Sequence, residues 1–202
     1  LVQWYAGEQQ GCTLADILLG KVNPSGKLNV SFPRSTGNTP CFYNHFVTDR
    51  EESFDQPGTP EEPKGHYIFD KPEPLWNFGH GKSYTTFDYV DCALSDTLLV
   101  ASDTLKVSVT IKNTGRRDGK EVVQLYVRDK VSTVATPIQQ LKAFQKVLIK
   151  PGESQCVELS LPIAELALYN AKMEEVVEPG DFEIQIGAAS DDIRFKKTIT
   201  IN

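Results

Sequence analysis

The stretch that decides the fold reads Leu105-Lys106-Val107-Ser108-Val109-Thr110-Ile111-Lys112-Asn113-Thr114-Gly115. Apolar residues hold every second position from 105 to 111, and polar residues fill the positions between them. Successive side chains of a β-strand point to opposite faces, so this alternation gives one apolar face and one wet face, as in antiparallel sheets. Asn and Gly at 113–115 are turn residues. The pattern predicts a half-buried strand that ends in a turn.

The same period of two recurs through the rest of the chain. Further inward-facing sets are Val123, Leu125 and Val127; Val147 and Ile149; Val157, Leu159 and Leu161; Phe182, Ile184 and Ile186; and Ile193, Phe195, Ile199 and Ile201. Turn signals at 151–153 and 179–181 separate them, and a single helical turn is expected near 164–169. About seven short strands with regular turns indicate an immunoglobulin-like antiparallel β-sandwich. We assign it to residues 91–202 and place Phe182 and Phe195 in its core.

The first region, residues 1–35, has a mixed α/β pattern. Leu14, Ile17 and Leu18 recur at helical spacing between Gly11 and Gly20, and residues 27–32 alternate as a half-buried strand would. One helix and one strand cannot bury their own apolar faces. We therefore interpret residues 1–35 as an α/β remnant that either needs a sheet missing from this chain or docks on the second domain. Because the chain starts with Leu1 and its only methionine is Met173, we also expect it to be a fragment.

The middle region, residues 36–90, is rich in both proline and aromatic residues. Prolines limit regular structure, particularly at 55–63, whereas a disordered linker would contain few aromatic side chains. We expect an irregular but ordered connector that packs against the domains, with a mobile tip near residues 50–64. It could be a linker held by its aromatic residues or a long functional loop, and the first reading is preferred.

Composition excludes several classes of partner. The chain of 202 residues has a net charge of −6 and a pI near 5.1, which argues against a nucleic-acid footprint. No apolar run approaches the roughly 20 residues of a membrane span. Neither a nucleic-acid partner nor a membrane span is expected.

The residues contain no recognisable catalytic set. Neighbouring acidic residues lie in polar, loop-like sequence, where no apolar setting would raise a carboxyl pKa. These pairs are Glu51-Glu52, Glu61-Glu62, Glu174-Glu175 and Asp191-Asp192. The histidines, His45, His66 and His80, have no clustered partners, so no metal site is expected. We assign no catalytic, cofactor-binding or metal-binding residue and no cofactor. The sequon Asn29-Val30-Ser31 is interpreted as accidental because it lies in the predicted strand.

Three blocks of sequence resemble the carboxy-terminal portion of glycoside hydrolase family 3, the β-glucosidase and β-xylosidase family. The first comprises Trp4-Tyr5-Ala6-Gly7, Ala15-Asp16-Ile17-Leu18, Asn23-Pro24-Ser25-Gly26-Lys27-Leu28 and Phe32-Pro33-Arg34-Ser35. The second is Phe78-Gly79-His80-Gly81-Lys82-Ser83-Tyr84-Thr85-Thr86-Phe87. The third is Asn113-Thr114-Gly115 with Gly119-Lys120-Glu121-Val122-Val123-Gln124-Leu125-Tyr126-Val127, followed by Leu141-Lys142-Ala143-Phe144 and Glu178-Pro179-Gly180. Together, in this order, the blocks are specific.

The resemblance implies a parent enzyme with a (β/α)₈ barrel, an α/β sandwich domain and a fibronectin type III-like domain. Residues 1–35 would be the end of the α/β sandwich domain, and residues 91–202 would be the fibronectin type III-like domain. In the family the nucleophile is an aspartate of the barrel, and the acid/base glutamate usually lies in the α/β domain upstream of the Trp4 block. Neither position exists in this chain, and Glu8 is not taken as the acid/base. The parent would hydrolyse terminal β-D-glucosides or related β-glycosides by a retaining double displacement. This segment would be structural, and alone it would be inactive.

Two other functions remain open from the sequence. One is a carbohydrate-binding or wall-anchoring module, which would use exposed aromatic platforms; the other is a protein-interaction sandwich. The implied partners of the leading hypothesis are the upstream barrel and α/β domains, with an oligosaccharide substrate bound through the parent. Family resemblance points to a secreted or periplasmic location. The blocks depart from the family pattern at Ala6, His80 and Lys82, and these departures leave the sugar specificity open.

Overall fold

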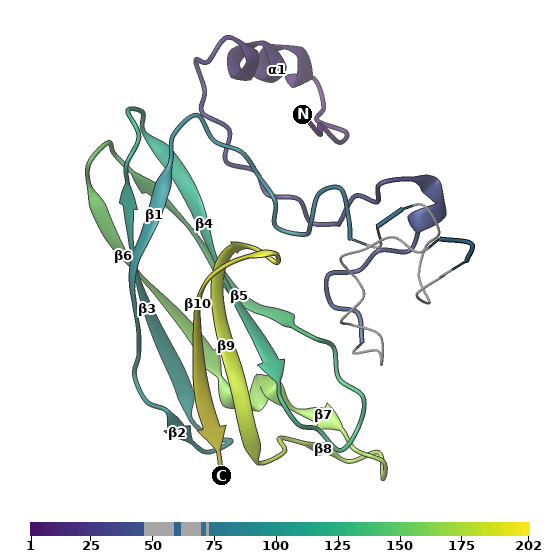
Figure 1. Ribbon diagram of the computed structural model, residues 1–202. Coiled ribbons are helices and arrows are strands. Elements are labelled where there is room, and N and C mark those ends of the chain that lie inside the picture. Colours follow the sequence, from purple (N-terminus) through teal and green to yellow (C-terminus); the bar gives the residue numbers. More distant parts are fainter. Residues whose placement is uncertain (47–58, 62–69, 72) are drawn as a thin grey trace.

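The computed structural model describes residues 1–46, 59–61, 70–71 and 73–202. Two sheets face each other in its carboxy-terminal part, and an extended amino-terminal segment runs across the top and one side of them (Figure 1). The helices are α1 (Gln10–Leu18), η1 (Thr36–Asn38) and η3 (Ile163–Leu166). The strands are β1 (Phe87–Leu94), β2 (Leu98–Leu99), β3 (Thr104–Asn113), β4 (Gly119–Asp129), β5 (Gln140–Ile149), β6 (Ser154–Pro162), β7 (Leu168–Tyr169), β8 (Glu175–Val176), β9 (Gly180–Ala189) and β10 (Asp192–Ile201).

The predicted β-sandwich is confirmed. One sheet has the order β1-β3-β6 and the other β2-β10-β9-β4-β5; β7 and β8 form a small separate hairpin. Neighbouring strands are antiparallel except for β2, which pairs with β10 in parallel. β1 starts at Phe87, so the first strand crosses the boundary we predicted at residue 90.

Register explains why the core is continuous. In the β3–β6 pair, Leu105 lies opposite Leu161 and Val107 opposite Leu159. Directly opposite residues project to the same face, so each pair places two apolar side chains between the sheets. Phe182 is buried and Phe195 packs half-buried against the same core, as predicted.

The helix predicted between Gly11 and Gly20 is present as α1, but the predicted strand at 27–32 is wrong. Residues 28–32 are extended and run antiparallel to residues 75–80, with only one isolated bridge, Phe32 to Trp76. A bend at 29–30 interrupts the pairing, because the segment has a single neighbour rather than a sheet on both sides. Asn29 is therefore exposed and outside any strand, which removes our reason for dismissing the sequon.

The two extended segments form an irregular ribbon. At one end the Leu28 amide donates to the His80 carbonyl (2.8 Å) and the Gly79 amide donates to the Leu28 carbonyl (2.7 Å). At the other end the Phe32 amide donates to the Trp76 carbonyl, and the Leu75 amide to the Phe32 carbonyl, both at 2.8 Å. We call residues 73–84 the strap. The predicted mobile tip at 50–64 lies outside the described residues, except for 59–61.

Candidate functional site: the strap on the outer face of the sandwich

Strand β4 is buried on both of its faces. All six residues from Val122 to Val127 are buried, although alternate side chains of a strand point in opposite directions. Val123, Leu125 and Val127 belong to the core between the sheets. Tyr126, on the opposite face, is nevertheless 0% exposed. A second layer must therefore cover the outside of the five-stranded sheet, and the ribbon that contains the strap supplies it.

Gln124 is the polar centre of this second layer. Its side-chain Nε2 donates to the carbonyls of Gly79 (3.4 Å) and Ala188 (2.6 Å), and its Oε1 accepts from the Tyr126 hydroxyl (2.6 Å). The buried amide thus has partners for both of its ends, which removes the cost of burying it. Gln124 thereby joins the strap to both β4 and β9.

Glycine is the only residue type that fits at position 79. Its φ is +81°, in the left-handed region that favours glycine. A Cβ here would overlap Gln124 Oε1 and would lie 3.0 Å from the Ala189 Cα. The strap approaches the sheet this closely because residue 79 has no side chain.

Aromatic stacking closes the same layer. The rings of Tyr43 and Phe78 stack with centroids 4.1 Å apart, and Tyr43 meets the Tyr126 ring edge-on at 5.9 Å. The Tyr43 hydroxyl accepts from the Leu141 amide on β5 (3.2 Å). Burial raises the pKa of Tyr126, so its hydroxyl stays protonated and can donate to Gln124. Of the connector's aromatic residues, Tyr43 and Phe78 thus pack against the sandwich, whereas Phe42, Phe46, Trp76 and Tyr84 remain exposed.

A shielded ion pair ties the amino-terminal segment to β4. Lys27 Nζ lies 3.1 Å from Glu121 Oε1, with side-chain exposures of only 16% and 7%. The Tyr89 hydroxyl donates to the same carboxylate oxygen at 3.3 Å. Burial raises the pKa of the Tyr89 hydroxyl, and the Glu121 carboxylate adds to that rise. Loss of Lys27 would leave a buried carboxylate without its counter-ion, which is strongly destabilising in general.

Hydrogen bonds at the top of the sandwich fix the carboxy-terminal end of α1. Asn23 Nδ2 donates to the Asp118 carbonyl (2.8 Å), and its Oδ1 accepts from Ser83 Oγ (2.9 Å). The Tyr84 hydroxyl donates to the Ile17 carbonyl (2.8 Å), and Arg117 Nη1 donates to the Gly20 carbonyl (2.9 Å). Helix α1 is therefore held at its end, while its sides receive no cover from these bonds.

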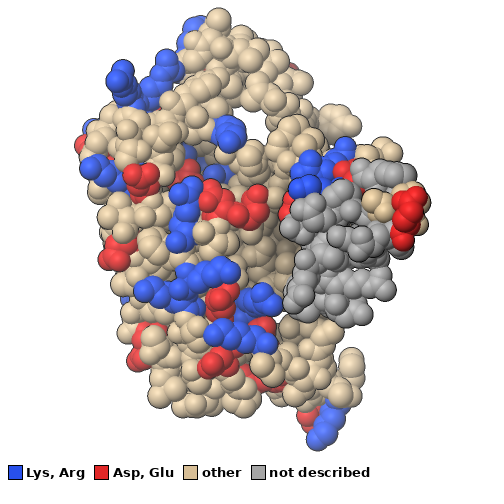
Figure 2. All heavy atoms as spheres, viewed as in Figure 1, with Lys and Arg blue, Asp and Glu red and all other residues tan. Residues whose placement is uncertain are grey.

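The amino-terminal segment leaves a large apolar surface uncovered. Helix α1 has no buried residue, and its last residue, Leu18, and the C-cap residue, Leu19, are 64% and 72% exposed. Other exposed large apolar residues of this part of the chain are Leu1, Val2, Trp4, Tyr5, Val22, Val30, Phe42, Phe46, Leu75, Trp76 and Tyr84. Figure 2 shows mostly uncharged atoms over α1, whereas acidic and basic side chains intermix on the sandwich. Exposed large apolar side chains that gather in one segment are typical of interaction sites.

The structure does not bring the sequence-predicted acidic pairs together into one site. Glu174 and Glu175 are exposed on the β7–β8 hairpin. Asp191 accepts from Asn77 Nδ2 (2.7 Å), and Asp192 accepts from Arg194 Nη2 (2.9 Å). Glu61 is exposed, whereas Glu51, Glu52 and Glu62 lie outside the described residues.

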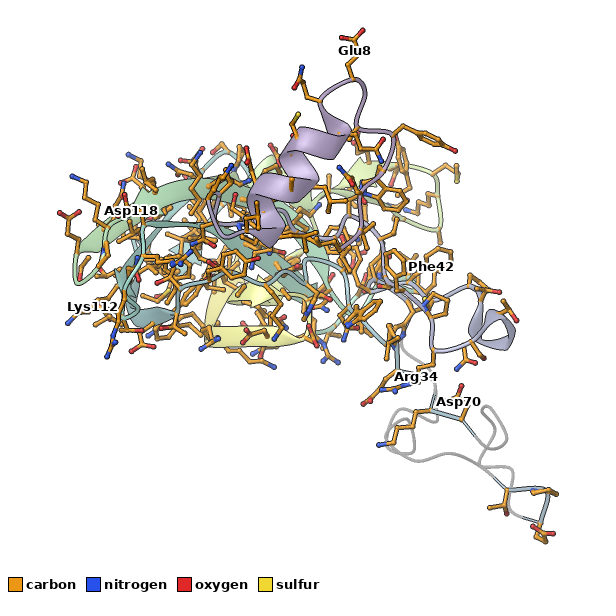
Figure 3. All side chains as sticks on the ribbon, turned by 90° about the horizontal axis from the view of Figure 1, so that it is seen from above. Glu8, Arg34, Phe42, Asp70, Lys112 and Asp118 are labelled. Carbon is orange, nitrogen blue, oxygen red and sulfur yellow. The ribbon has the colours of Figure 1, made fainter. Side chains whose placement is uncertain are left out.

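The remaining candidates are dispersed as well. Glu8 projects away from the molecule near the start of α1 (Figure 3). His45 lies half-buried next to the sandwich and His80 lies in the ribbon, where burial, followed by Lys82, lowers the pKa of its imidazole. His66 lies outside the described residues. Among the described residues, no group of three or more His, Cys, Asp or Glu side chains is arranged to hold a metal. In the same residues no helix is long and apolar enough to cross a membrane.

The outer face of β4 was not predicted from the sequence. The alternation placed Val123, Leu125 and Val127 in the core, whereas no role was assigned to Val122, Gln124 and Tyr126. The signal was available: a strand with one wet face should alternate, whereas Val122-Val123-Gln124-Leu125-Tyr126-Val127 is almost continuously apolar.

The architecture defines a fibronectin type III-like sandwich that carries an amino-terminal ribbon on its outer face. The family model described as the fibronectin type III-like domain matches residues 121–190. The model described as the glycosyl hydrolase family 3 C-terminal domain matches residues 1–84. The chain therefore belongs to glycoside hydrolase family 3 and corresponds to the carboxy-terminal portion of such enzymes.

Relatives and solved structures agree with this assignment. The chain is 40% identical over 193 residues to a periplasmic β-glucosidase of Salmonella typhimurium. The aligned residues cover 94% of this chain and 24% of the relative. It is 41% identical over 196 residues to a β-xylosidase of Formosa agariphila, covering 96% of this chain and 26% of the relative. A crystal structure of a β-glucosidase from Listeria innocua superposes with a TM-score of 0.85 at 37% identity, covering 98% of this chain and 27% of that one. The chain thus spans about a quarter of the length of the relatives it matches.

Proposed function

We propose that this chain is the noncatalytic brace of a β-glycosidase that hydrolyses terminal β-D-glucosides or related β-glycosides. The observation that supports this proposal most is that one apolar face of this chain is covered and another is not. Gly79 of the strap and Tyr43 cover Gln124 and Tyr126 on the outer face of β4, while α1 and the aromatic residues near it remain uncovered. Such a brace holds one end of a larger enzyme and offers its free apolar face to the domains upstream.

The upstream partner is proposed to be the α/β sandwich domain, followed by the barrel. Trp4, Phe32 and Trp76 form a half-open aromatic cluster, with ring centroids 6.3 Å apart for the first pair and 5.9 Å for the second. Trp4 and Trp76 are 57% and 44% exposed. Burial of apolar area contributes roughly 25 cal/mol per Å², so covering this face would stabilise the whole enzyme appreciably.

The chemistry is proposed to depend on residues outside this chain. A retaining glycosidase needs two carboxyl groups about 5–5.5 Å apart, one as nucleophile and one as acid/base. The acidic residues considered above are paired with cations or amides, or are exposed on hairpins and loops. A carboxylic acid that donates a proton near neutral pH needs an apolar or like-charged setting, and these residues have neither. We therefore assign the nucleophile and the acid/base to the upstream domains.

The test is hydrolysis of aryl β-glucoside and aryl β-xyloside by the purified 202-residue chain, beside the longer enzyme that contains it. The proposal predicts no turnover above buffer by the chain and turnover by the longer enzyme, whose preference then identifies the sugar. Turnover by the chain that survives repurification and follows its concentration would overturn the noncatalytic assignment.

A further inference from the structure

A pocket lies beside η3 and β7. Figure 1 shows these two elements at the end of the sandwich that is farthest from α1. The pocket lies between β4, β5 and β9 on one side and the η3–β7 segment on the other. Its lining residues are Val127, Asp129, Thr136, Gln140, Lys142, Leu166, Ala167, Leu168 and Phe182. Neither the strap nor the uncovered apolar face of the amino-terminal segment contributes to this lining.

Two opposite charges share this pocket without pairing with each other. In the described part of the chain, no ion pair of 4.0 Å or less joins Asp129 to Lys142. Asp129 Oδ1 accepts from the Val131 amide (3.2 Å), which leaves its other oxygen available. Lys142 Nζ donates to the Glu165 carbonyl (2.7 Å), which leaves two of its three N–H groups available. Both side chains therefore keep hydrogen-bonding capacity toward a ligand.

Both charges are also partly desolvated. Burial raises the pKa of the Asp129 carboxyl, and Glu178 adds to that effect. Burial lowers the pKa of the Lys142 ammonium, and Glu165 opposes it. Titratable groups perturbed by burial that meet in one cleft are candidates for a binding site.

The lining restricts the class of ligand. A cation would be attracted by Asp129 but repelled by Lys142, and an anion would meet the reverse situation. A neutral molecule with several hydroxyl groups can donate to the carboxylate and accept from the ammonium at once. Phe182, Leu166 and Leu168 give the pocket an apolar wall, against which the C–H face of a sugar ring can pack. We propose that this pocket binds one neutral monosaccharide unit, with Asp129 and Lys142 as its polar contacts.

The inference does not rest on the proposed brace function, since it uses only contacts within the sandwich. It also differs from the carbohydrate-binding module considered from the sequence, which required exposed aromatic platforms. Of the later aromatic residues, Phe144 and Tyr169 are exposed, but neither lines the pocket.

The test is titration of the ¹⁵N-labelled 202-residue chain with glucose and with xylose, followed by amide chemical shifts. We expect saturable shifts at residues 127, 142, 168 and 182, with a Kd of about 1–20 mM, typical of a few hydrogen bonds to a small ligand. Asp129→Asn and Lys142→Gln should each weaken binding about fivefold or more, because each removes one charge-assisted hydrogen bond. Lys106→Gln, which removes an exposed lysine paired with Glu158 on the other sheet, is the matched control and should change nothing.

Several outcomes would overturn the proposal. They are the absence of saturable shifts up to about 100 mM sugar, shifts confined to other residues, and binding by both variants that is as tight as that of the unchanged chain. Equal or tighter binding of glycine, a zwitterion that could also bridge the two charges, would reject the sugar class. Thermal melts of each variant establish that it is folded. If Lys142→Gln does not fold, Lys142→Arg keeps the charge but changes its geometry, and it should still weaken binding.

Discussion

Helix α1 leaves its apolar residues exposed or half-buried, whereas strand β4 buries its apolar residues. Helix α1 exposes all of its residues wholly or in part, including leucines that a globular protein normally buries. Strand β4 buries both of its faces, one in the sandwich core and one under the strap. Strand β4 is covered by residues of this chain, whereas the cover that we propose for α1 is another domain. The following predictions test that contrast, from the largest expected effect to the smallest.

The outer face of β4 should matter as much as its inner face. Tyr126→Ala is expected to lower the free energy of unfolding by about 3–5 kcal/mol, comparable with Leu125→Ala on the core side, because both remove a fully buried side chain. Urea denaturation of the 202-residue chain measures both. Tyr126→Phe, which removes only the hydroxyl that donates to Gln124, should cost about 1–2 kcal/mol. A Tyr126→Ala cost below that of the Phe variant would mean that the strap does not pack on the sheet in solution.

Two glycines offer a matched pair for the contact between strap and sheet. Gly79 and Gly152 have φ values of +81° and +76°, but only Gly79 has atoms within 4 Å of an added Cβ. Alanine at either position should cost about 1 kcal/mol for its left-handed backbone. Gly79→Ala should cost a further 1–3 kcal/mol or so, because the new methyl group overpacks the contact with Gln124. Equal costs in the two variants would contradict the close approach of strap and sheet.

The imidazole of His80 should make the ribbon sensitive to acid. Its pKa is lowered from 6.5 chiefly by burial and next by Lys82, while Asp191 and Asp192 oppose that shift. Between the lowered pKa and 6.5 the unfolded chain binds the proton more readily, so stability falls as the pH is lowered through this window. His80→Gln should reduce that pH dependence in denaturation curves measured from pH 7.5 to pH 5. If the pH dependence of stability is the same in His80→Gln, groups other than His80 cause it.

Helix α1 should tolerate polar substitution in the isolated chain. Leu18→Ser removes an exposed apolar side chain, so the stability of the 202-residue chain should change by no more than about 0.5 kcal/mol. In the longer enzyme the same change is expected to lower the midpoint of thermal unfolding, because there the leucine is proposed to be covered. A loss in the isolated chain as large as that of Tyr126→Ala would contradict the contrast between α1 and β4.

The strands of the sandwich could be predicted from the sequence because each has a period of two and ends at a turn residue. Residues 105–111 and 182–186 illustrate this, and the helix at α1 followed from its spacing of apolar residues. The segment at 27–32 also alternates, yet it forms no sheet, because alternation reports which sides are wet and not how many neighbours a segment has. The pairing of residues 28–32 with 75–80 joins segments far apart in the chain, and local pattern contains no information on it.

The junction was harder to predict for a different physical reason. Gln124 looks like a wet position in an otherwise apolar strand, and only its three partners in space explain its burial. Gly79 similarly appears as an ordinary loop glycine until its distance to Gln124 and Ala189 is known. The pocket at Asp129 and Lys142 depends on where β4, β5 and β9 meet the η3–β7 segment, and no motif marks it.

Native-state amide hydrogen exchange on the 202-residue chain measures most directly whether the ribbon and the sandwich form one cooperative body. The amides of Leu28, Phe32 and Gly79 donate only to carbonyls within the ribbon, so their protection reports the stability of the ribbon itself. The account predicts that they open with nearly the same free energy as the amides of β4, which is the signature of one cooperative unit. Exchange of these three amides at the rate of an open loop, with β4 still protected, would contradict it.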